Sequence, residues 1–546
     1  MSAARRLRWL GLALAAPLVL IVLAAAMWAP LSRWLEETTG EATVDEQARA
    51  FVWLLRRRPI ETADFVPAAH AGVVPYGVNT FFEQEVDEEK VRRSMALLQA
   101  VGVRWIRQEF PWDRIEIPEK GRYEDPYGGE TWTTYDRIVR LAGEYGLEIL
   151  ARPDLPPVWA RSNRSVPRGI PDDWEDYGDF LTALAERYRG QIHYWQIWNE
   201  PNLLHEWGDA PDPREYAAFL RMARERLKAV DADAVIVSAS LAQTLGTEDG
   251  LNVSDLDYLE ALYEAGAAPL FDILAANAYG LWTGPADPRI DREHTNVGRL
   301  LLVREIMVRH GDAAKAVWVS ELGWNAVPPD FPGGRPHGQV TEDQQARYTV
   351  QLYRMAQERW PWVGAMFYWH FRRAYPENRA ESDYYFRMLD VDFTPLPVFE
   401  AYSDLAMSPP VLGVGAHLPS HWALRWQGWR TDGQGRRVSE RAGDRLSFRF
   451  SGTDLSLFVR GAGSLRVGMD GAPPYLVDAQ PAGEVRLAQG LAPGAHSALI
   501  EARGPGLAIE QVVVRREMSP FWVRRFLGVV LGLGLSALVA AAAVRH

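Results

Sequence analysis

The chain of 546 residues contains no cysteine. Disulfide bonds, thiolate nucleophiles and cysteine-ligated zinc are therefore excluded, while the compartment stays undetermined by this absence. The chain also has no basic run with interleaved aromatic residues, and its net charge is −12. We therefore expect no nucleic-acid partner.

Three other common signatures are missing as well: a His/Asp/Glu cluster with metal-ligand spacing, a glycine-rich phosphate loop and a serine nucleophile elbow. We therefore expect no metal and no organic cofactor. Tryptophan, in contrast, is abundant, with 22 residues. Many of these should fill a large core, but those near predicted strand ends also suit stacking against the flat C–H faces of sugar rings: Trp112, Trp159, Trp198, Trp324 and Trp369.

Two long uncharged stretches lie at the ends of the chain, over residues 9–30 and 526–544. Each is long enough to cross a bilayer core of about 30 Å, and each predicts a transmembrane helix. For the first stretch, a signal peptide cleaved near Ala24–Ala26 is the alternative, but the run exceeds the usual apolar region of about 7–15 residues. For the second, a buried soluble helix is the alternative, and the absence of a polar face disfavours it.

Arginines beside the two stretches favour opposite orientations. Those before the first stretch favour an inside N-terminus and place residues 31–520 outside, whereas those before the second oppose that placement. The two groups are Arg5, Arg6 and Arg8, and Arg515, Arg516, Arg524 and Arg525. Because the first transmembrane helix usually determines the orientation of the chain, we expect a cell-membrane protein whose folded part is extracytoplasmic.

The texture of the sequence changes near residue 410. Over residues 71–407, short apolar runs alternate with amphipathic helical patterns, which predicts a (β/α)₈ barrel. Over residues 411–516, period-two segments punctuated by glycine and proline predict an antiparallel, jelly-roll-like β-sandwich. Residues 38–70 predict a juxtamembrane helix and linker.

Two glutamates stand at the carboxyl ends of predicted barrel strands, Glu200 in Trp198–Pro201 and Glu321 in Val319–Trp324. The mouth formed by these strand ends is where barrel enzymes carry their chemistry, and opposed carboxylates there are what glycosidic-bond hydrolysis requires. An isolated Asn-Glu-Pro can simply start a helix, and a glutamate after a strand can cap or form a salt bridge. The joint occurrence of the two glutamate motifs on predicted barrel strands favours catalysis.

The eight expected strands of the barrel are 74–81, 103–107, 147–151, 193–198, 234–239, 271–276, 317–320 and 365–369.

Several blocks of the barrel region resemble the retaining (β/α)₈ glycoside hydrolases of the clan that contains families 39, 5 and 42, which are cellulase-like and β-xylosidase-like. The resemblance spans residues 72–405. Its blocks are Val103–Arg107, Trp112–Gly121, Leu147–Leu150 with Pro157–Ala160, Trp198–Pro201 and Val319–Trp324.

This resemblance implies that Glu200 is the acid/base, that Glu321 is the nucleophile and that Asn199 donates a hydrogen bond to the sugar 2-hydroxyl. Arg107, at the end of the second strand, is a candidate for keeping a nucleophilic carboxylate ionised. A retaining mechanism predicts carboxyl groups about 5–5.5 Å apart, whereas an inverting enzyme would separate them by roughly 6.5–9.5 Å.

Four further residues are candidates for substrate binding. Tyr279 could hydrogen-bond the nucleophile or pack at the barrel rim, and Trp369 could lie under a bound sugar or in the core. Asn79 and Trp324 are additional subsite candidates. Many clan members carry His two residues before this Tyr, whereas this chain has Asn277, a departure that puts the local hydrogen-bond network in doubt.

The expected function is a membrane-anchored retaining glycosidase acting on β-linked poly- or oligosaccharide. The alternatives are a catalytically silent carbohydrate-binding or scaffold protein, and a transglycosylase using the same two glutamates. The sandwich could bind sugar through Trp422, Trp426 and Trp429, or these residues could belong to its first strand and the domain interface. Sugar identity and mode of action depend on long loops, Leu281–Asn296 and Asn325–Thr341.

Overall fold

The computed structural model describes residues 36, 39–41, 43–56, 58–166 and 168–516. No helix in this part of the chain is both long and apolar enough to cross a membrane. The two predicted membrane segments, 9–30 and 526–544, lie outside the described residues.

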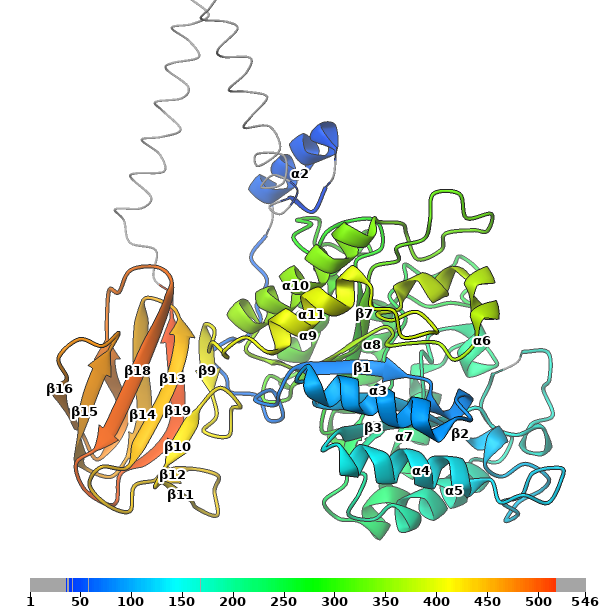
Figure 1. Cartoon of the computed structure of the whole chain (residues 1–546), viewed down its shortest axis with the longest axis horizontal. Helices are drawn as coiled ribbons and strands as arrows, with labels where there is room; N and C mark the ends of the chain where they lie inside the picture. Colours follow the sequence, from blue (N-terminus) through cyan, green and yellow to red (C-terminus); the bar gives the residue numbers. More distant parts are fainter. Residues whose placement is uncertain (1–35, 37–38, 42, 57, 167, 517–546) are drawn as a thin grey trace, which may run out of the picture.

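Eight parallel strands form a barrel in the order β5-β4-β3-β2-β1-β8-β7-β6 (Figure 1). The ring closes between β5 and β6 through a bridge of Val237 and Ile273, and the Ser238 N–H donates to the Ile273 carbonyl at 3.1 Å. This confirms the predicted (β/α)₈ barrel. The strands are β1 (Tyr76–Thr80), β2 (Trp105–Pro111), β3 (Glu148–Asp154), β4 (Tyr194–Gln196), β5 (Val235–Val237), β6 (Leu274–Tyr279), β7 (Val317–Gly323) and β8 (Val363–Tyr368).

Helices surround this barrel, and polar caps start several of them. Asp87 caps α3, Asp212 caps α7 with Pro213 at its first position, and Thr341 forms a reciprocal capping box with Gln344 at α10. Each cap satisfies backbone N–H groups that the helix itself leaves unpaired. The helices are α2 (Val44–Arg56), α3 (Glu88–Ala100), α4 (Trp132–Glu144), α5 (Trp174–Arg187), α6 (Leu204–Trp207), α7 (Pro213–Val230), α8 (Asp255–Glu264), α9 (Arg299–Arg309), α10 (Glu342–Arg359) and α11 (Pro397–Ala406).

Aromatic side chains close the amino end of the barrel. The rings of Trp105, Tyr194 and Trp318 lie 4.9 to 5.0 Å apart, centre to centre. The indole N–H of Trp105 donates to the Val74 carbonyl, and that of Trp318 to the His70 carbonyl, at 2.8 and 3.0 Å. This packing fills the bottom of the barrel and leaves the carboxyl ends of the strands as its mouth.

The second unit consists of two antiparallel sheets, as the period-two pattern predicts. Along β13, Leu446, Phe448 and Phe450 are buried between the sheets while the alternate residues point outward. Its strands are β9 (Gly415–His417), β10 (Arg425–Gln427), β11 (Arg430–Thr431), β12 (Arg437–Val438), β13 (Arg445–Ser451), β14 (Asp454–Arg460), β15 (Gly463–Met469), β16 (Tyr475–Ala479), β17 (Ala482–Ala488), β18 (Ala495–Ala502) and β19 (Ala508–Arg515).

Two histidines lie where the sandwich meets the barrel, His417 buried and His421 half-buried. The rings of His417 and His421 are 5.0 Å apart, and the backbone of Gly72 lies against His421 so closely that a Cβ on Gly72 would come within 2.8 Å of its Cα. The next residue, Trp422, donates its backbone N–H to the Gly72 carbonyl at 2.8 Å and packs its ring against Tyr76. Trp422 therefore belongs to the domain interface. Trp426 and Trp429 pack on each other within the sandwich.

Candidate active site

Glu200 and Glu321 both lie at the mouth of the barrel, but on different kinds of backbone. Glu321 is part of the regular strand β7 and is 6% exposed. Glu200 follows β4 on a turn in which Trp198 and Glu200 itself have φ angles of 74° and 40°, and its N–H donates to the Ser240 carbonyl at 2.9 Å. Positive φ is uncommon for residues other than glycine and persists only where the surroundings hold it.

Arg107, on β2, is the centre of a buried hydrogen-bond network around Glu321. Its Nη1 donates to Glu321 Oε1 at 2.7 Å and to Asn79 Oδ1 at 2.9 Å. Its Nε donates to Gln196 Oε1 at 2.6 Å, and its Nη2 to Asn199 Oδ1 at 2.9 Å. The predicted pairing of Arg107 with the strand-seven glutamate is therefore present in the structure.

The other carboxylate oxygen of Glu321 faces β6. The Tyr279 hydroxyl donates to Glu321 Oε2 at 2.8 Å, so each oxygen of the carboxylate has its own donor. Burial and the charge of Glu321 raise the pKa of Tyr279 well above its ordinary value, so the phenol keeps the proton that it donates. A second guanidinium, Arg152, places its Nη1 4.0 Å from Glu321 Oε1.

Glu200 has a neutral partner instead of an arginine. The Asn277 Nδ2 donates to Glu200 Oε1 at 2.8 Å, while Asn277 Oδ1 accepts from Ser320 Oγ at 3.1 Å. Burial, together with the carboxylates of Glu321 and Glu206, raises the pKa of Glu200 well above its ordinary value. The asparagine that departs from the clan pattern thus has a defined contact with this carboxyl group.

The role implied for Asn199 requires a free donor, and the structure provides one. Its Oδ1 is held by Arg107, which orients the amide so that Nδ2 faces away from that guanidinium. Within the described part of the chain, no residue accepts a hydrogen bond from this Nδ2 group. The donor is therefore free for a ligand.

A charged cluster beside the glutamates was not anticipated from the sequence. Arg152 contacts the Glu109 carboxylate and lies 3.0 Å from Asp154 Oδ2, and all three side chains are nearly buried. Burial and the neighbouring Glu109 raise the pKa of Asp154 well above its ordinary value, against the opposing charge of Arg152. Nearby, Arg168 pairs with Glu206 at 3.0 Å. The only signal in the sequence was the charged pair in Arg152-Pro-Asp154 at the end of the third strand.

The remaining candidates occupy different environments. Trp369 follows β8, is half-buried and lies edge-on to Phe81 with ring centres 5.5 Å apart, so part of its ring stays accessible. Asn79 is buried and holds the barrel wall by donating to the Ser320 carbonyl at 3.0 Å. Trp324 is fully buried and donates to the Thr283 carbonyl at 2.7 Å. The structure therefore places Asn79 behind Glu321 and Trp324 inside the wall, and brings neither to the open mouth.

One group of side chains has the donors for a cation. Ligand atoms of Glu200, His205 and Glu206 lie within 4.8 Å of one another. Glu206, however, already neutralises Arg168, and protonation of Glu200 removes a second anionic donor. Both features weaken the group as a site for a divalent cation.

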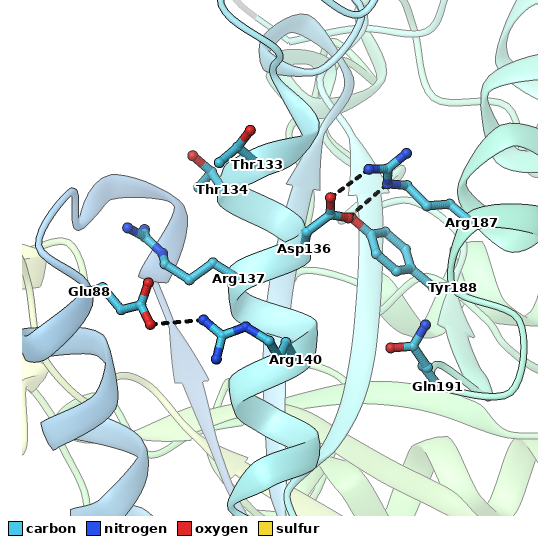
Figure 2. A pocket seen from close by; sticks show the side chains of 9 residues that line it. All are labelled: Glu88, Thr133, Thr134, Asp136, Arg137, Arg140, Arg187, Tyr188 and Gln191. Carbon is cyan, nitrogen blue, oxygen red and sulfur yellow. Dashed lines mark hydrogen bonds and ion pairs between the residues drawn. The ribbon is translucent and has the colours of Figure 1, made fainter.

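A separate hollow of about 650 Å³ lies outside the barrel, along α4 (Figure 2). Two of its arginines are ion-paired, Arg140 with Glu88 at 2.8 Å and Arg187 with Asp136 at 2.5 Å, while Arg137 donates to the Glu85 and Val86 carbonyls. The hollow lies among the outer helices, away from the strand ends, and contains neither Glu200 nor Glu321.

Comparison with known proteins gave similarities of structure only. No protein-family model and no curated protein matches the sequence. Similar solved structures include a family 39 glycoside hydrolase from Bacteroides cellulosilyticus WH2, with 16% identity and a TM-score of 0.47 over 81% of this chain and 82% of that one. A monomeric β-xylosidase from Caulobacter crescentus CB15 has 15% identity and a TM-score of 0.46 over 81% of this chain and 98% of the xylosidase. An exo-β-1,4-mannosidase from Opitutaceae bacterium strain TAV5 has 17% identity and a TM-score of 0.43 over 64% and 62%.

At such low identity, and with TM-scores below 0.5, these similarities carry no argument about activity. The functional conclusion therefore depends on the side chains that this chain itself presents at the barrel mouth.

Proposed function

We propose that the protein is a membrane-anchored retaining glycoside hydrolase that cleaves β-linked poly- or oligosaccharides by double displacement. The observation that carries this proposal is the contrast between two carboxyl groups at one barrel mouth. Glu321 is ion-paired with Arg107 and hydrogen-bonded by Tyr279, whereas the pKa of Glu200 is raised by burial and by Glu321. One anion and one protonated acid side by side are what the reaction needs.

In the first step, Glu321 attacks the anomeric carbon while Glu200 gives its proton to the glycosidic oxygen. The bond between anomeric carbon and oxygen breaks, the alcohol leaves, and an ester links the sugar to Glu321. The free Nδ2 of Asn199 is the donor for the sugar 2-hydroxyl, and the accessible part of the Trp369 ring is the platform for the sugar face.

In the second step, the roles of Glu200 reverse. Esterification removes the negative charge of Glu321, so the pKa of Glu200 falls and its carboxylate can accept a proton from water. The water oxygen attacks the anomeric carbon, the ester breaks, and Glu321 regains its charge. Two inversions give net retention of configuration, and the carboxyl groups are predicted to lie about 5–5.5 Å apart.

Membrane anchoring is the second part of the proposal. It depends on the uncharged stretches at residues 9–30 and 526–544. The contact between the Arg515 guanidinium and the Phe65 ring, at 5.6 Å, is compatible with it because it brings the segment after α2 beside the end of β19. The start and end of the described chain lie on one side of the molecule (Figure 1), so both stretches can enter the same bilayer.

The decisive experiment uses the full chain in detergent micelles. A panel of aryl β-glycosides and β-linked polysaccharides would be incubated with it, and the anomer formed first would be identified by NMR. A 2-deoxy-2-fluoro glycoside with a good leaving group would then be used to trap the ester.

Release of the β-anomer, with the label on the peptide that contains Glu321, is expected. First appearance of the α-anomer would overturn the retaining mechanism, and products longer than the substrate would indicate transglycosylation. A folded chain that binds glycans without cleaving them would favour the silent binding protein.

A further inference from the structure

The segment that follows the N-terminal uncharged stretch is packed onto the barrel instead of extending away from it. In Figure 1, α2 lies on the side of the barrel where α9 and α10 are found. The described residues of this segment, Glu36, 39–41 and α2, contact two loops of the barrel mouth. These are the β6–α9 loop, which contains residues 281–296, and the start of α10, which follows the β7–α10 loop.

The closest approach is between two glycine backbones. The Gly284 N–H donates to the Gly40 carbonyl at 2.6 Å. A Cβ on Gly284 would lie 3.1 Å from the Gly40 Cα, and a Cβ on Gly40 would lie 2.6 Å from the backbone nitrogen of Asp287. Gly40 also has a φ of 73°, which disfavours other residues. Both positions therefore depend on the absence of a side chain.

An ion-pair cluster lies next to this contact. Arg289, on the loop, contacts the Glu41 carboxylate and pairs with Asp287 at 2.8 Å. Glu41 and Asp287 are both nearly buried. Burial raises the pKa of Glu41 to about 7. The charge of Arg289 lowers this pKa, whereas the charges of Asp287 and Glu46 raise it. The Glu41 carboxylate is thus buried against the loop. The N-terminal segment is therefore packed on the barrel at this point.

Glu36 makes the second attachment, to the first turns of α10. Its carboxylate accepts from the Tyr348 hydroxyl at 2.5 Å, from Gln344 Nε2 at 2.9 Å and from Arg347 Nη2 at 3.3 Å. Three donors converge on one carboxylate, and charge-assisted hydrogen bonds are the stronger class. The ring of Tyr348 in turn packs against Trp324, with centres 5.5 Å apart.

From these attachments, a continuous set of contacts leads to Glu321. Asp287 accepts from the Thr283 hydroxyl at 2.9 Å, and the Thr283 carbonyl accepts from the Trp324 indole at 2.7 Å. Gly280 packs directly on that indole, where a Cβ would lie 1.9 Å from Nε1. The residue before Gly280 is Tyr279, which donates to Glu321.

We propose that Glu36 and residues 39–41 act as a brace that holds the β6–α9 loop in place and, through it, positions Tyr279 against Glu321. The N-terminal segment is then a positioning element of the active site as well as a connection to the membrane. The part of this inference that concerns catalysis depends on the proposed glycosidase function, whereas the part that concerns the loop does not.

The test compares three variants of the full chain in detergent. The double variant Glu36→Ala/Glu41→Ala removes the two carboxylate attachments and leaves the Gly40–Gly284 backbone contact and the barrel residues unchanged. Glu36→Gln with Glu41→Gln retains hydrogen-bonding oxygens of the same shape and should rescue part of the effect. Asp45→Ala is the matched control, because Asp45 lies in the same segment but its carboxylate bonds the exposed Arg49 and Thr43 and, among the described residues, makes no ion pair with the barrel.

Hydrogen exchange of residues 281–296 should accelerate by about tenfold or more in the double alanine variant and stay unchanged in the control. The same variant should lose about tenfold in kcat/KM, with kcat and KM both changed, because a loop of the mouth is released. Unchanged exchange in this loop, or an equal acceleration in the control, would overturn the brace. Faster exchange with unaltered kcat/KM would overturn its positioning role. An inactive parent would count against the proposed function, while the exchange measurement would still decide the brace.

Discussion

The β7 side and the β4 side of the barrel mouth each carry a glutamate, and they hold it by different means. On the β7 side, a regular strand presents Glu321 to a guanidinium and a phenol. On the β4 side, a turn with positive φ angles presents Glu200 to the neutral amide of Asn277. The first environment favours a carboxylate, and the second favours a carboxylic acid.

This difference shows that neighbouring side chains can give two identical carboxyl groups different environments, which the proposed reaction requires. The charge of Arg107 cannot serve both glutamates equally, because its Nη1 lies 2.7 Å from Glu321 while its remaining donors are used by Gln196, Asn79 and Asn199. The pKa of Glu200 is therefore raised mainly by burial and by repulsion from the carboxylates of Glu321 and Glu206. Substitutions at four positions can break or sharpen this contrast.

The largest effect is expected from Glu321→Gln. The amide cannot attack the anomeric carbon, so kcat on aryl β-glycosides should fall on the order of 10³-fold or more. The fluoro-sugar label should disappear from the peptide that contains residue 321. Activity equal to that of the parent chain would show that another group is the nucleophile.

Glu200→Gln should give a loss that depends on the leaving group. General acid catalysis contributes typically 10²–10⁴-fold, so cleavage of unactivated oligosaccharides should fall by about that factor. An aryl glycoside with an acidic phenol needs no proton in the first step and should form the ester at nearly the parent rate, giving a burst followed by slow turnover. A uniform loss on both substrates would contradict the acid/base assignment.

Tyr279→Phe should have a smaller effect. It removes the donor to Glu321 Oε2 and leaves the Arg107 contact in place. A hydrogen bond to a charged group contributes about 1.5–3 kcal/mol, which predicts a loss in kcat/KM of roughly 10- to 150-fold. Steady-state kinetics on one aryl glycoside would measure it, and a change below twofold would exclude a role for the phenol.

The smallest effect is a change in the pH profile. Because Glu200 must be protonated to act as the acid, kcat/KM should be high below its raised pKa and fall as the pH rises through it. Asn277→Asp places a further carboxylate beside Glu200 and should move this alkaline limb to higher pH, whereas Asn277→Ala adds no charge. A shift to lower pH in the aspartate variant would contradict the electrostatic account.

The barrel, the sandwich and the positions of both glutamates followed from local patterns. Apolar runs of strand length, helical periodicity between them and the two glutamate motifs are all read within short windows of sequence. The contact of Arg107 with Glu321 was also anticipated, because the sequence predicted both residues near the carboxyl ends of barrel strands, and such ends converge on one mouth.

Other features depend on the direction of side chains and on distant contacts. Trp324 lies just beyond Glu321 in sequence, yet its indole points into the wall, where Gly280 leaves room for it. The cluster of Glu109, Arg152 and Asp154 joins two neighbouring strands in a way that neither strand reveals alone. The docking of Glu36 and Glu41 onto the barrel likewise joins residues about 250 to 310 positions apart, beyond the reach of any periodicity.

Protonation of the two histidines between the barrel and the sandwich would destabilise the junction of these two units. Burial lowers the pKa of His417 to about 4 and that of His421 well below its ordinary value, and the charge of His417 also disfavours protonation of His421. The unfolded or separated histidines would take up protons near pH 6.5, so the docked arrangement loses stability as the pH falls from there toward 4. Below about pH 6.5, the burial of these imidazoles therefore becomes a cost to the folded state, which sets an acid limit on the packing of the barrel against the sandwich.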